Sequence, residues 1–231
     1  RPAHLGRGEK AALCHVSPRH RPQPVRIALA PDATFRNRAA TDIFEPGSSI
    51  KPFIVAAALA SGRYSERSFV DTSPGFFRVG IKIIEDKHNL GSISLGEILE
   101  KSSNVGVAKV ALALAPERIW HTLSDLGFGQ VTSSDFPGES AGLLSNYSHW
   151  RPIDIATMAY GYGLSVTPLQ LAHAYATLGS GGIARPVSFV RIDGEVAGQR
   201  VLDAHLTGAL IHMMESVVTA EGTGLQAAIP W

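Results

Sequence analysis

A serine and a lysine three positions apart precede a long apolar run in the segment EPGSSIKPFIVAAALASG. On a helix this spacing places Ser48 and Lys51 on one face, within contact distance of each other. Pro46 and Gly47 indicate that the helix begins at or near Ser48, and Pro52 is compatible only with its first turn. Ser48 would then lie at the positive end of the helix dipole, which favours a serine alkoxide and disfavours a protonated lysine.

Lys51 is therefore a candidate base for the serine. The reference pKa of lysine is about 10.4, and removal from water or nearby positive potential lowers it. A buried Lys51 at a helix N-terminus meets both conditions. The alternative is that Ser48 caps the helix and that Lys51 is a solvated residue of the first turn. The S-x-x-K pattern alone favours this alternative, because average composition yields such a match about once in a chain of this length.

A second polar cluster, Ser102-Ser103-Asn104, lies between two predicted helices and is the only S-x-N pattern in the chain. Residues two apart do not share a helix face, so Ser102 and Asn104 can point into one cleft only if the backbone turns there. The second serine would carry a proton to a leaving amine, and Asn104 would hold a substrate amide or the Lys51 side chain. The alternative is an ordinary connection between helices.

Composition narrows the class of protein. A chain of 231 residues with 45% hydrophobic and 18% charged residues is typical of a globular protein with one large or two small domains. The net charge of +1 disfavours a nucleic-acid partner. One cysteine and nine scattered histidines show no metal-ligand spacing, so neither a metal nor another cofactor is expected. No apolar segment approaches the roughly 18 to 20 residues of a membrane span, and the first residues lack the apolar centre of a signal peptide, so we expect any anchor or export signal to lie outside this sequence.

The elements that must position these residues are mostly helices. Ser94 and Glu97 form a capping-box pattern at one helix start, and Gly62 is a plausible end for the first helix. A β-hairpin is predicted around Asp193-Gly194. Helices are predicted at residues 50 to 61, 94 to 103, 104 to 115, 116 to 127, 151 to 163, 167 to 182 and 204 to 224. The pattern indicates one mainly helical α/β unit with few strands. Residues 1 to 36 differ from the rest and are expected to be either poorly ordered or an edge strand, with VRIALA as the candidate strand.

Four segments in order, NRAATDIFEPGSSIKPFIVAAAL, SSNVGVAKVAL, DFPGESAGLL and AYGYGLSVTPLQLAHAYATLGSGG, resemble the transpeptidase domain of class B penicillin-binding proteins, most of all the division-specific (septal) type. The likeness runs from about Asn37 to Pro230. It implies the α/β (α+β) fold of penicillin-binding proteins and serine β-lactamases, in a domain of residues 37 to 231. It also implies a place on the bacterial inner membrane facing the periplasm, with the anchor outside this chain, and other division proteins as partners of the parent protein.

The resemblance implies serine acyl transfer on the D-Ala-D-Ala end of peptidoglycan stem peptides, without a cofactor. Ser48 would attack the penultimate D-alanine carbonyl, Lys51 would accept the serine proton, and Ser102 with Asn104 would relay the proton and orient the peptide. An amine of a neighbouring stem peptide would then take the acyl group and close a cross-link. β-Lactams would acylate Ser48. Tyr162 would line the cleft, with core packing as an equal alternative.

The sequence departs from the family at one motif. The Lys-Thr/Ser-Gly strand that supplies a second oxyanion donor does not occur, and the chain runs TAEGTGLQAAIPW to its last residue. We therefore expect a domain and a sheet that are incomplete at the C-terminal end. Loss of one oxyanion donor costs about a hundred- to a thousand-fold in rate, which leaves open whether this chain is itself active. Two alternatives follow: a non-catalytic penicillin-binding sensor or pseudoenzyme, and a serine β-lactamase with Glu139 as deacylation base.

Overall fold

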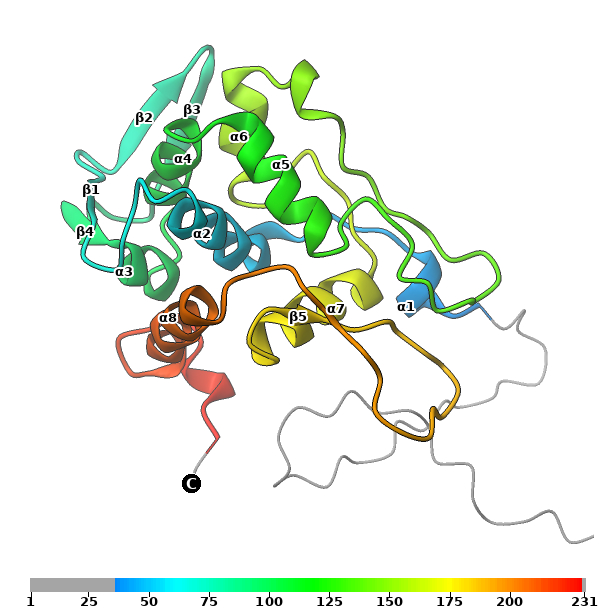
Figure 1. The fold of residues 1–231 in the computed structure, drawn as a ribbon. Coiled ribbons are helices and arrows are strands. Elements are labelled where there is room, and N and C mark those ends of the chain that lie inside the picture. Colours follow the sequence, from blue (N-terminus) through cyan, green and yellow to red (C-terminus); the bar gives the residue numbers. More distant parts are fainter. Residues whose placement is uncertain (1–35, 230–231) are drawn as a thin grey trace, which may run out of the picture.

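Helix α2 (Lys51–Ala60) is the central element of the computed structural model, which describes residues 36 to 229. Every side chain from Lys51 to Ala58 is buried. Three of these eight residues are alanines, whose small side chains let neighbouring helices approach closely. Helix α2 packs against helices α4 (Asn104–Leu112), α5 (Pro116–Asp125) and α8 (Ala204–Glu215), which surround it in Figure 1.

The helices begin close to the predicted residues, but some end earlier than predicted: the helix expected at residues 151 to 163 ends at Met158, and the one expected at residues 204 to 224 ends at Glu215. The capping box at Ser94 and Glu97 is present, with both reciprocal hydrogen bonds, and confirms the predicted start of α3. Gly62 follows α2 with φ +69°, a left-handed conformation that suits glycine. The remaining helices are α1 (Arg38–Thr41), α3 (Leu95–Glu100), α6 (Pro152–Met158), α7 (Pro168–Gly179) and the 3₁₀ helices η1 (Gly47–Ile50), η2 (Tyr147–His149), η3 (Ser216–Val218) and η4 (Leu225–Ala227).

Strands are few in the described part of the chain, as the sequence indicates. They form three antiparallel pairs: β1 (Phe69–Asp71) with β4 (Ser92–Ser94), β2 (Phe76–Val79) with β3 (Lys82–Glu85), and β5 (Ile183–Ala184) with β6 (Gln199–Arg200). The β2–β3 hairpin, which was not predicted, extends beside α4 and α6 (Figure 1).

The hairpin predicted around Asp193-Gly194 is wrong. Residues 185 to 198 contain no strand, and the pairing that exists lies outside them, in β5 and β6. The alternating apolar residues of this segment do not form a buried face: Phe189, Val190 and Ile192 are 44%, 73% and 49% exposed, although Phe189 contacts Phe136. Alternation stabilises a strand only when one face is buried.

Aromatic side chains also pack against α2 in the core. Phe53 packs edge-on against Phe128 and Tyr175, with ring centroids 5.3 and 5.0 Å apart.

Between residues 36 and 229, no helix has the length and apolar character that a membrane span requires. The predicted strand VRIALA and nearly all of the segment 1 to 36 lie outside the described residues.

Candidate active site

Ser48 lies in the 3₁₀ turn η1, which leads directly into α2. The sequence predicts a helix start at or near Ser48, and the structure places the 3₁₀ turn from Gly47 and the α-helix from Lys51. Gly47 has φ +57°, and the Ser49 hydroxyl donates to the Pro46 carbonyl at 2.7 Å. The turn is therefore closed by its own residues.

The AYGYG segment supports this turn from outside. The Gly47 N–H donates to the Gly161 carbonyl at 3.2 Å, and a Cβ on Gly161 would lie 2.0 Å from the Gly47 carbonyl oxygen. Only glycine permits so close an approach of two backbones. Glu45 adds a further link, since its carboxylate accepts from the Gly163 N–H at 2.9 Å. Gly161 and Gly163 therefore support the turn that carries Ser48, a role that the sequence analysis did not identify.

Lys51 is almost fully buried, with 2% of its surface exposed. Its Nζ donates to the Ser102 carbonyl at 2.5 Å, to Ser102 Oγ at 2.9 Å and to Asn104 Oδ1 at 2.8 Å. Burial lowers the pKa of Lys51 to about 8, and the negative charge of Asp86 opposes this shift. At pH 7 a lysine with a pKa of about 8 is neutral in about a tenth of molecules, against fewer than about one in a thousand for an exposed lysine.

Ser102 connects Lys51 to Ser48. Its hydroxyl donates to Ser48 Oγ at 3.1 Å while accepting from Lys51 Nζ. Ser102 has φ +55°, so the backbone turns at this position and brings Ser102 and Asn104 to the same cleft. The Lys51 ammonium makes no hydrogen bond to the Ser48 hydroxyl in the described part of the chain. The two side chains are instead joined through the Ser102 hydroxyl, which contacts both.

Asp86 holds the loop that carries these side chains. Its Oδ1 accepts from the backbone N–H groups of Asn104 and Val105 at 2.6 and 3.1 Å, and its Oδ2 accepts from the Ser103 hydroxyl at 2.5 Å. No sequence spacing marks this contact, because Asp86 lies at the end of β3 and meets the loop only in the folded chain.

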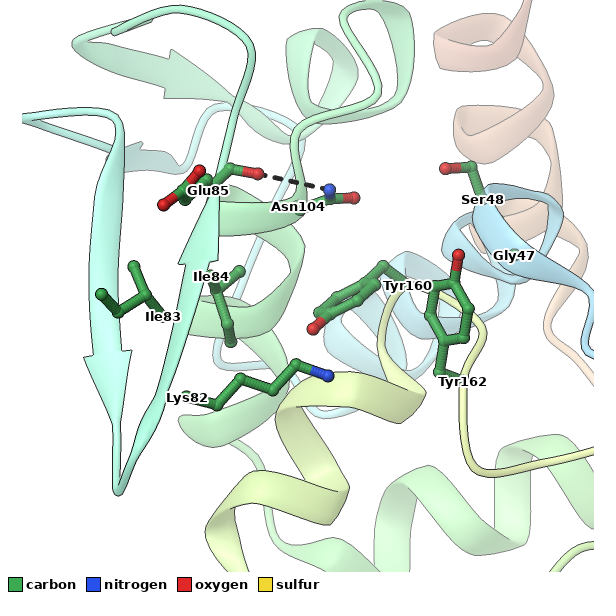
Figure 2. A pocket seen from close by; sticks show the side chains of 9 residues that line it. All are labelled: Gly47, Ser48, Lys82, Ile83, Ile84, Glu85, Asn104, Tyr160 and Tyr162. Carbon is green, nitrogen blue, oxygen red and sulfur yellow. Dashed lines mark hydrogen bonds between the residues drawn. The ribbon is translucent and has the colours of Figure 1, made fainter.

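Two cavities meet at Ser48 and share Ser48, Glu85 and Asn104. The first, of about 360 Å³, is shown in Figure 2: Tyr160 and Tyr162 lie on one side and the β3 side chains on the other. Tyr162 is 49% exposed and Tyr160 is 8% exposed, and their rings meet edge-on at 5.7 Å. Both tyrosines therefore line the cavity, but Tyr162 is exposed on its wall whereas Tyr160 is mostly buried in the core. The Asn104 amide donates to the Glu85 carbonyl at 3.3 Å.

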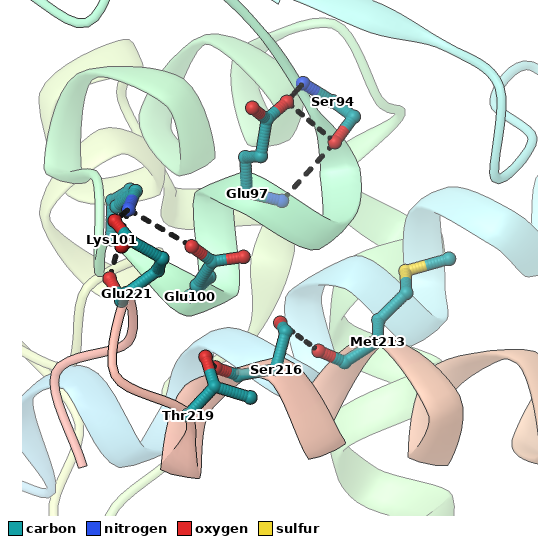
Figure 3. Close-up of polar contacts among 8 residues, drawn as sticks. All are labelled: Ser94, Glu97, Glu100, Lys101, Met213, Ser216, Thr219 and Glu221. Atoms are coloured by element: carbon teal, nitrogen blue, oxygen red, sulfur yellow. Dashed lines mark hydrogen bonds and ion pairs between the residues drawn. The ribbon is translucent and has the colours of Figure 1, made fainter. Parts of the chain in front are cut away.

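The second cavity, of about 530 Å³, has a wall from the C-terminal segment. Lys101 donates to the Glu221 carbonyl at 2.8 Å and contacts the Glu100 carboxylate at 2.9 Å (Figure 3). The Thr223 N–H donates to the Glu100 carbonyl at 3.2 Å, which places Thr223 on the cavity wall. The residues after α8 are thereby fastened beside Ser102.

Glu139 lies elsewhere. Its carboxylate accepts from the hydroxyls of Thr132 and Ser134, at 2.5 and 2.6 Å, and these bonds hold the pKa of Glu139 low against the effect of its burial. It lines neither cavity that contains Ser48. Within residues 36 to 229, no group of three or more His, Cys, Asp and Glu side chains could hold a metal ion.

Known proteins are similar to this chain over most of its length. The family model of the penicillin binding protein transpeptidase domain matches residues 8 to 231. The peptidoglycan D,D-transpeptidase FtsI of Escherichia coli (strain K12) is 42% identical over 222 residues, which are 96% of this chain and 37% of that protein. The probable peptidoglycan D,D-transpeptidase PenA of Neisseria meningitidis serogroup A is 39% identical over 206 residues, 89% of this chain and 35% of that protein. The chain thus spans little more than a third of the length of these relatives.

Solved structures agree in fold. The apo structure of the TP domain of Burkholderia pseudomallei penicillin-binding protein 3 has a TM-score of 0.81 and 40% identity, covering 84% of this chain and 60% of that one. A peptidoglycan glycosyltransferase from Burkholderia ambifaria has a TM-score of 0.82 and 39% identity, covering 85% and 63%. These matches confirm the predicted fold class, and the chain belongs to the family of penicillin-binding protein transpeptidase domains.

Proposed function

We propose that this chain acts in a peptidoglycan D,D-transpeptidase, with Ser48 as the nucleophile that carries the acyl group. The observation that supports this most directly is the hydrogen-bonded series from Ser48 Oγ through Ser102 Oγ to the buried Lys51 Nζ. A serine needs an adjacent base to become a nucleophile at neutral pH. Lys51 meets that need because its lowered pKa leaves part of the population neutral.

In the proposed reaction Lys51 accepts a proton from Ser102 Oγ as Ser102 accepts the proton of Ser48 Oγ. The Ser48 oxygen bonds to the penultimate D-alanine carbonyl carbon, and its backbone N–H donates to the developing oxyanion. The bond to the terminal D-alanine nitrogen then breaks, and the proton returns through Ser102 to that leaving amine. The amine of a second stem peptide then attacks the resulting ester carbonyl and loses a proton through Ser102 and Lys51. This proton returns to the Ser48 oxygen as the ester bond breaks, and the new amide is the cross-link.

Asn104 and Tyr162 would bind the peptide in this scheme. Asn104 faces both cavities and holds Lys51, so its amide would orient a peptide beside the base. Tyr162 would provide an apolar contact on the cavity wall. The same site would be acylated by β-lactams. By the family resemblance of its sequence motifs, the complete protein would work in septal cell-wall synthesis with other division proteins, anchored in the inner membrane with this domain in the periplasm.

A β-lactamase is not favoured. It requires a second base that activates water at the acyl-enzyme, and the candidate Glu139 is engaged by Thr132 and Ser134 away from both cavities. A sensor or pseudoenzyme would keep the fold but would not turn over peptide, so it differs from a transpeptidase in peptide turnover and not in fold.

The test is intact-mass spectrometry after incubation with a fluorescent penicillin, applied to this chain and to the complete gene product. Stable labelling that Ser48→Ala abolishes is expected. Ser49→Ala should still be labelled, because the Ser49 hydroxyl donates inside the turn to Pro46. An adduct that disappears within minutes would indicate a β-lactamase, and a stable adduct without peptide turnover would indicate a sensor. No adduct in either folded protein would refute the proposal.

A further inference from the structure

We infer that Asp86 is a positioning residue for the acyl transfer: its carboxylate fixes the loop that places Ser102 between Ser48 and Lys51. The inference depends on the proposed function for its catalytic meaning. None of the family's sequence motifs quoted above includes this residue.

Asp86 is itself held in place. It directly follows β3, and its backbone N–H donates to the Gly75 carbonyl at 2.9 Å across the base of the β2–β3 hairpin. The aspartate is thus fixed to a different element from the loop that it contacts. All three hydrogen bonds accepted by its carboxylate come from consecutive residues, Ser103, Asn104 and Val105. These residues follow Ser102 directly and include the side chain that binds Lys51.

The loop needs such an anchor because Ser102 adopts a costly conformation. A positive φ costs a non-glycine residue about 1 to 2 kcal/mol, and it persists only where the surroundings over-determine it. The Ser103 N–H donates to the Ile98 carbonyl at 2.9 Å on one side of the loop. Asp86 fixes the other side at the start of α4, where a negative charge also interacts favourably with the helix dipole.

The charge of Asp86 acts on Lys51 as well as on the loop. It stabilises the Lys51 ammonium and so opposes the effect of burial on the lysine pKa. Lys51 otherwise contacts the neutral groups of Ser102 and Asn104. Other titratable side chains on the two cavities also face this region, namely Glu85, Lys87, His88, Lys101, Tyr160, Tyr162 and Lys82. A comparison between variants that differ at one residue isolates the contribution of Asp86 from theirs.

Two variants separate the positional from the electrostatic role. Asp86→Asn keeps the shape and removes the charge. Ser103→Ala removes two hydrogen bonds of the Ser103 hydroxyl, the one it donates to Asp86 and the one it accepts from the Gly106 N–H, and leaves every charge. The second-order rate constant of acylation by a fluorescent penicillin is measured against pH in the complete gene product. We expect both variants to acylate about ten- to a hundred-fold more slowly, since a small misplacement of a reacting group has this effect. Only Asp86→Asn should move the acidic limb of the profile to lower pH.

A second readout needs no catalytic activity. The ¹³Cε signal of Lys51 in lysine-labelled protein, assigned with Lys51→Arg, reports the Lys51 pKa directly. Asp86→Asn should lower this pKa below the wild-type value of about 8, and Ser103→Ala should leave it unchanged. Glu139→Gln is the matched control, because Glu139 also fastens a loop through hydroxyls but lies away from both cavities. It should reduce thermal stability without changing the acylation profile or the Lys51 pKa.

The outcomes are distinct. An unlabelled wild type would overturn the proposed function, and the Lys51 titration would still test the contact with Asp86. A labelled wild type whose rate and Lys51 pKa are unchanged in Asp86→Asn would overturn the inference alone. If Asp86→Asn does not fold, the positioning role is tested with Ser103→Ala. An acylation rate equal to wild type in the folded variant would refute this role. A slower rate with an unchanged acidic limb of the pH profile would support it.

Discussion

The hydroxyl oxygens of Ser48 and Ser102 lie 3.1 Å apart, although 54 positions separate the two residues in the chain. The Lys51 ammonium contacts Ser102 Oγ at 2.9 Å and, within the described residues, makes no hydrogen bond to Ser48. The lysine that sequence spacing pairs with Ser48 is thus connected to it through a third residue. When Lys51 is neutral, Ser102 can pass its own proton to Lys51 and accept the proton of Ser48 across these two contacts.

Ser102→Ala should therefore impair acylation by about a hundred-fold or more, because it removes the group that transfers the proton. The fold should be retained, since Lys51 keeps its bonds to the Ser102 carbonyl and to Asn104. Stopped-flow measurement of penicillin acylation, with thermal unfolding as a check, tests this. Ser216→Ala is a suitable control, because the Ser216 hydroxyl donates to the Met213 carbonyl at the end of α8 (Figure 3). Equal rates in Ser102→Ala and wild type would show that Lys51 takes the proton directly.

The lowered pKa of Lys51 predicts a pH-dependent stability. In the folded chain this pKa is about 8, against 10.5 without burial, so between these values the unfolded chain binds more protons. The free energy of unfolding must then rise with pH across this window. Below pH 8 the lysine is protonated in both states and the cost of its burial is present in full.

Lys51→Met removes this titration. The difference in unfolding free energy, wild type minus Lys51→Met, should increase by about 3 kcal/mol from pH 8 to pH 10.5, measured by urea unfolding. Lys101→Met is the control, since bonds to Glu100 and Glu221 raise the pKa of Lys101 and so no increase is expected in that window. A flat difference for Lys51→Met would contradict the burial of a titrating lysine.

The local features of the fold could be predicted from the sequence, because they depend on neighbouring residues. The capping box at Ser94, the left-handed Gly62 and the start of α7 at Pro168 all follow from helix-end chemistry. The S-x-x-K and S-x-N patterns likewise identified the residues that the folded chain brings together. Their local geometry, a turn before α2 and a turn between α3 and α4, is encoded within a few positions of each.

The tertiary contacts could not be predicted in the same way. The Asp86 carboxylate, just after β3, accepts a hydrogen bond from the Asn104 N–H at the start of α4. The spacing of polar and apolar residues in the sequence does not reveal a contact of this kind. The predicted hairpin failed for a related reason, because alternation at Val190 and Ile192 does not reveal whether a layer exists to bury one face. Tyr160 and Tyr162 have the same side chain but are 8% and 49% exposed, a difference that arises from the folded path of the segment after α6 and that the residue type does not reveal.

Gly161 should tolerate no side chain. A Cβ at this position would meet Gly47 at 2.0 Å, and φ +92° adds strain for any other residue. Gly163 has φ +83° and nothing within 4 Å of an added Cβ, so it provides a matched comparison. We expect Gly163→Ala to cost about 1 to 2 kcal/mol from backbone strain, and Gly161→Ala to cost about 1 to 3 kcal/mol more from the clash.

The clash should also displace Ser48, because it acts on the backbone of the nucleophile turn. Gly161→Ala should then lower the acylation rate by about a hundred-fold, whereas Gly163→Ala should have a smaller effect. Chemical unfolding and penicillin acylation of the two variants check both statements. Similar losses in the two variants would mean that the contact between Gly161 and Gly47 does not hold the turn.

Tyr160 and Tyr162 should separate stability from binding. Tyr160 is 8% exposed and packs within the core, so Tyr160→Ala should cost about 3 kcal/mol or more of stability. Tyr162 is 49% exposed on the cavity wall, so Tyr162→Ala should change stability by less than about 1 kcal/mol. The same truncation removes an apolar surface that a bound acyl donor would cover, and it should reduce acylation about ten-fold. Tyr162→Phe should restore the rate, because contact area rather than the hydroxyl is responsible. A Tyr162→Ala variant with normal acylation and reduced stability would assign Tyr162 to the core instead.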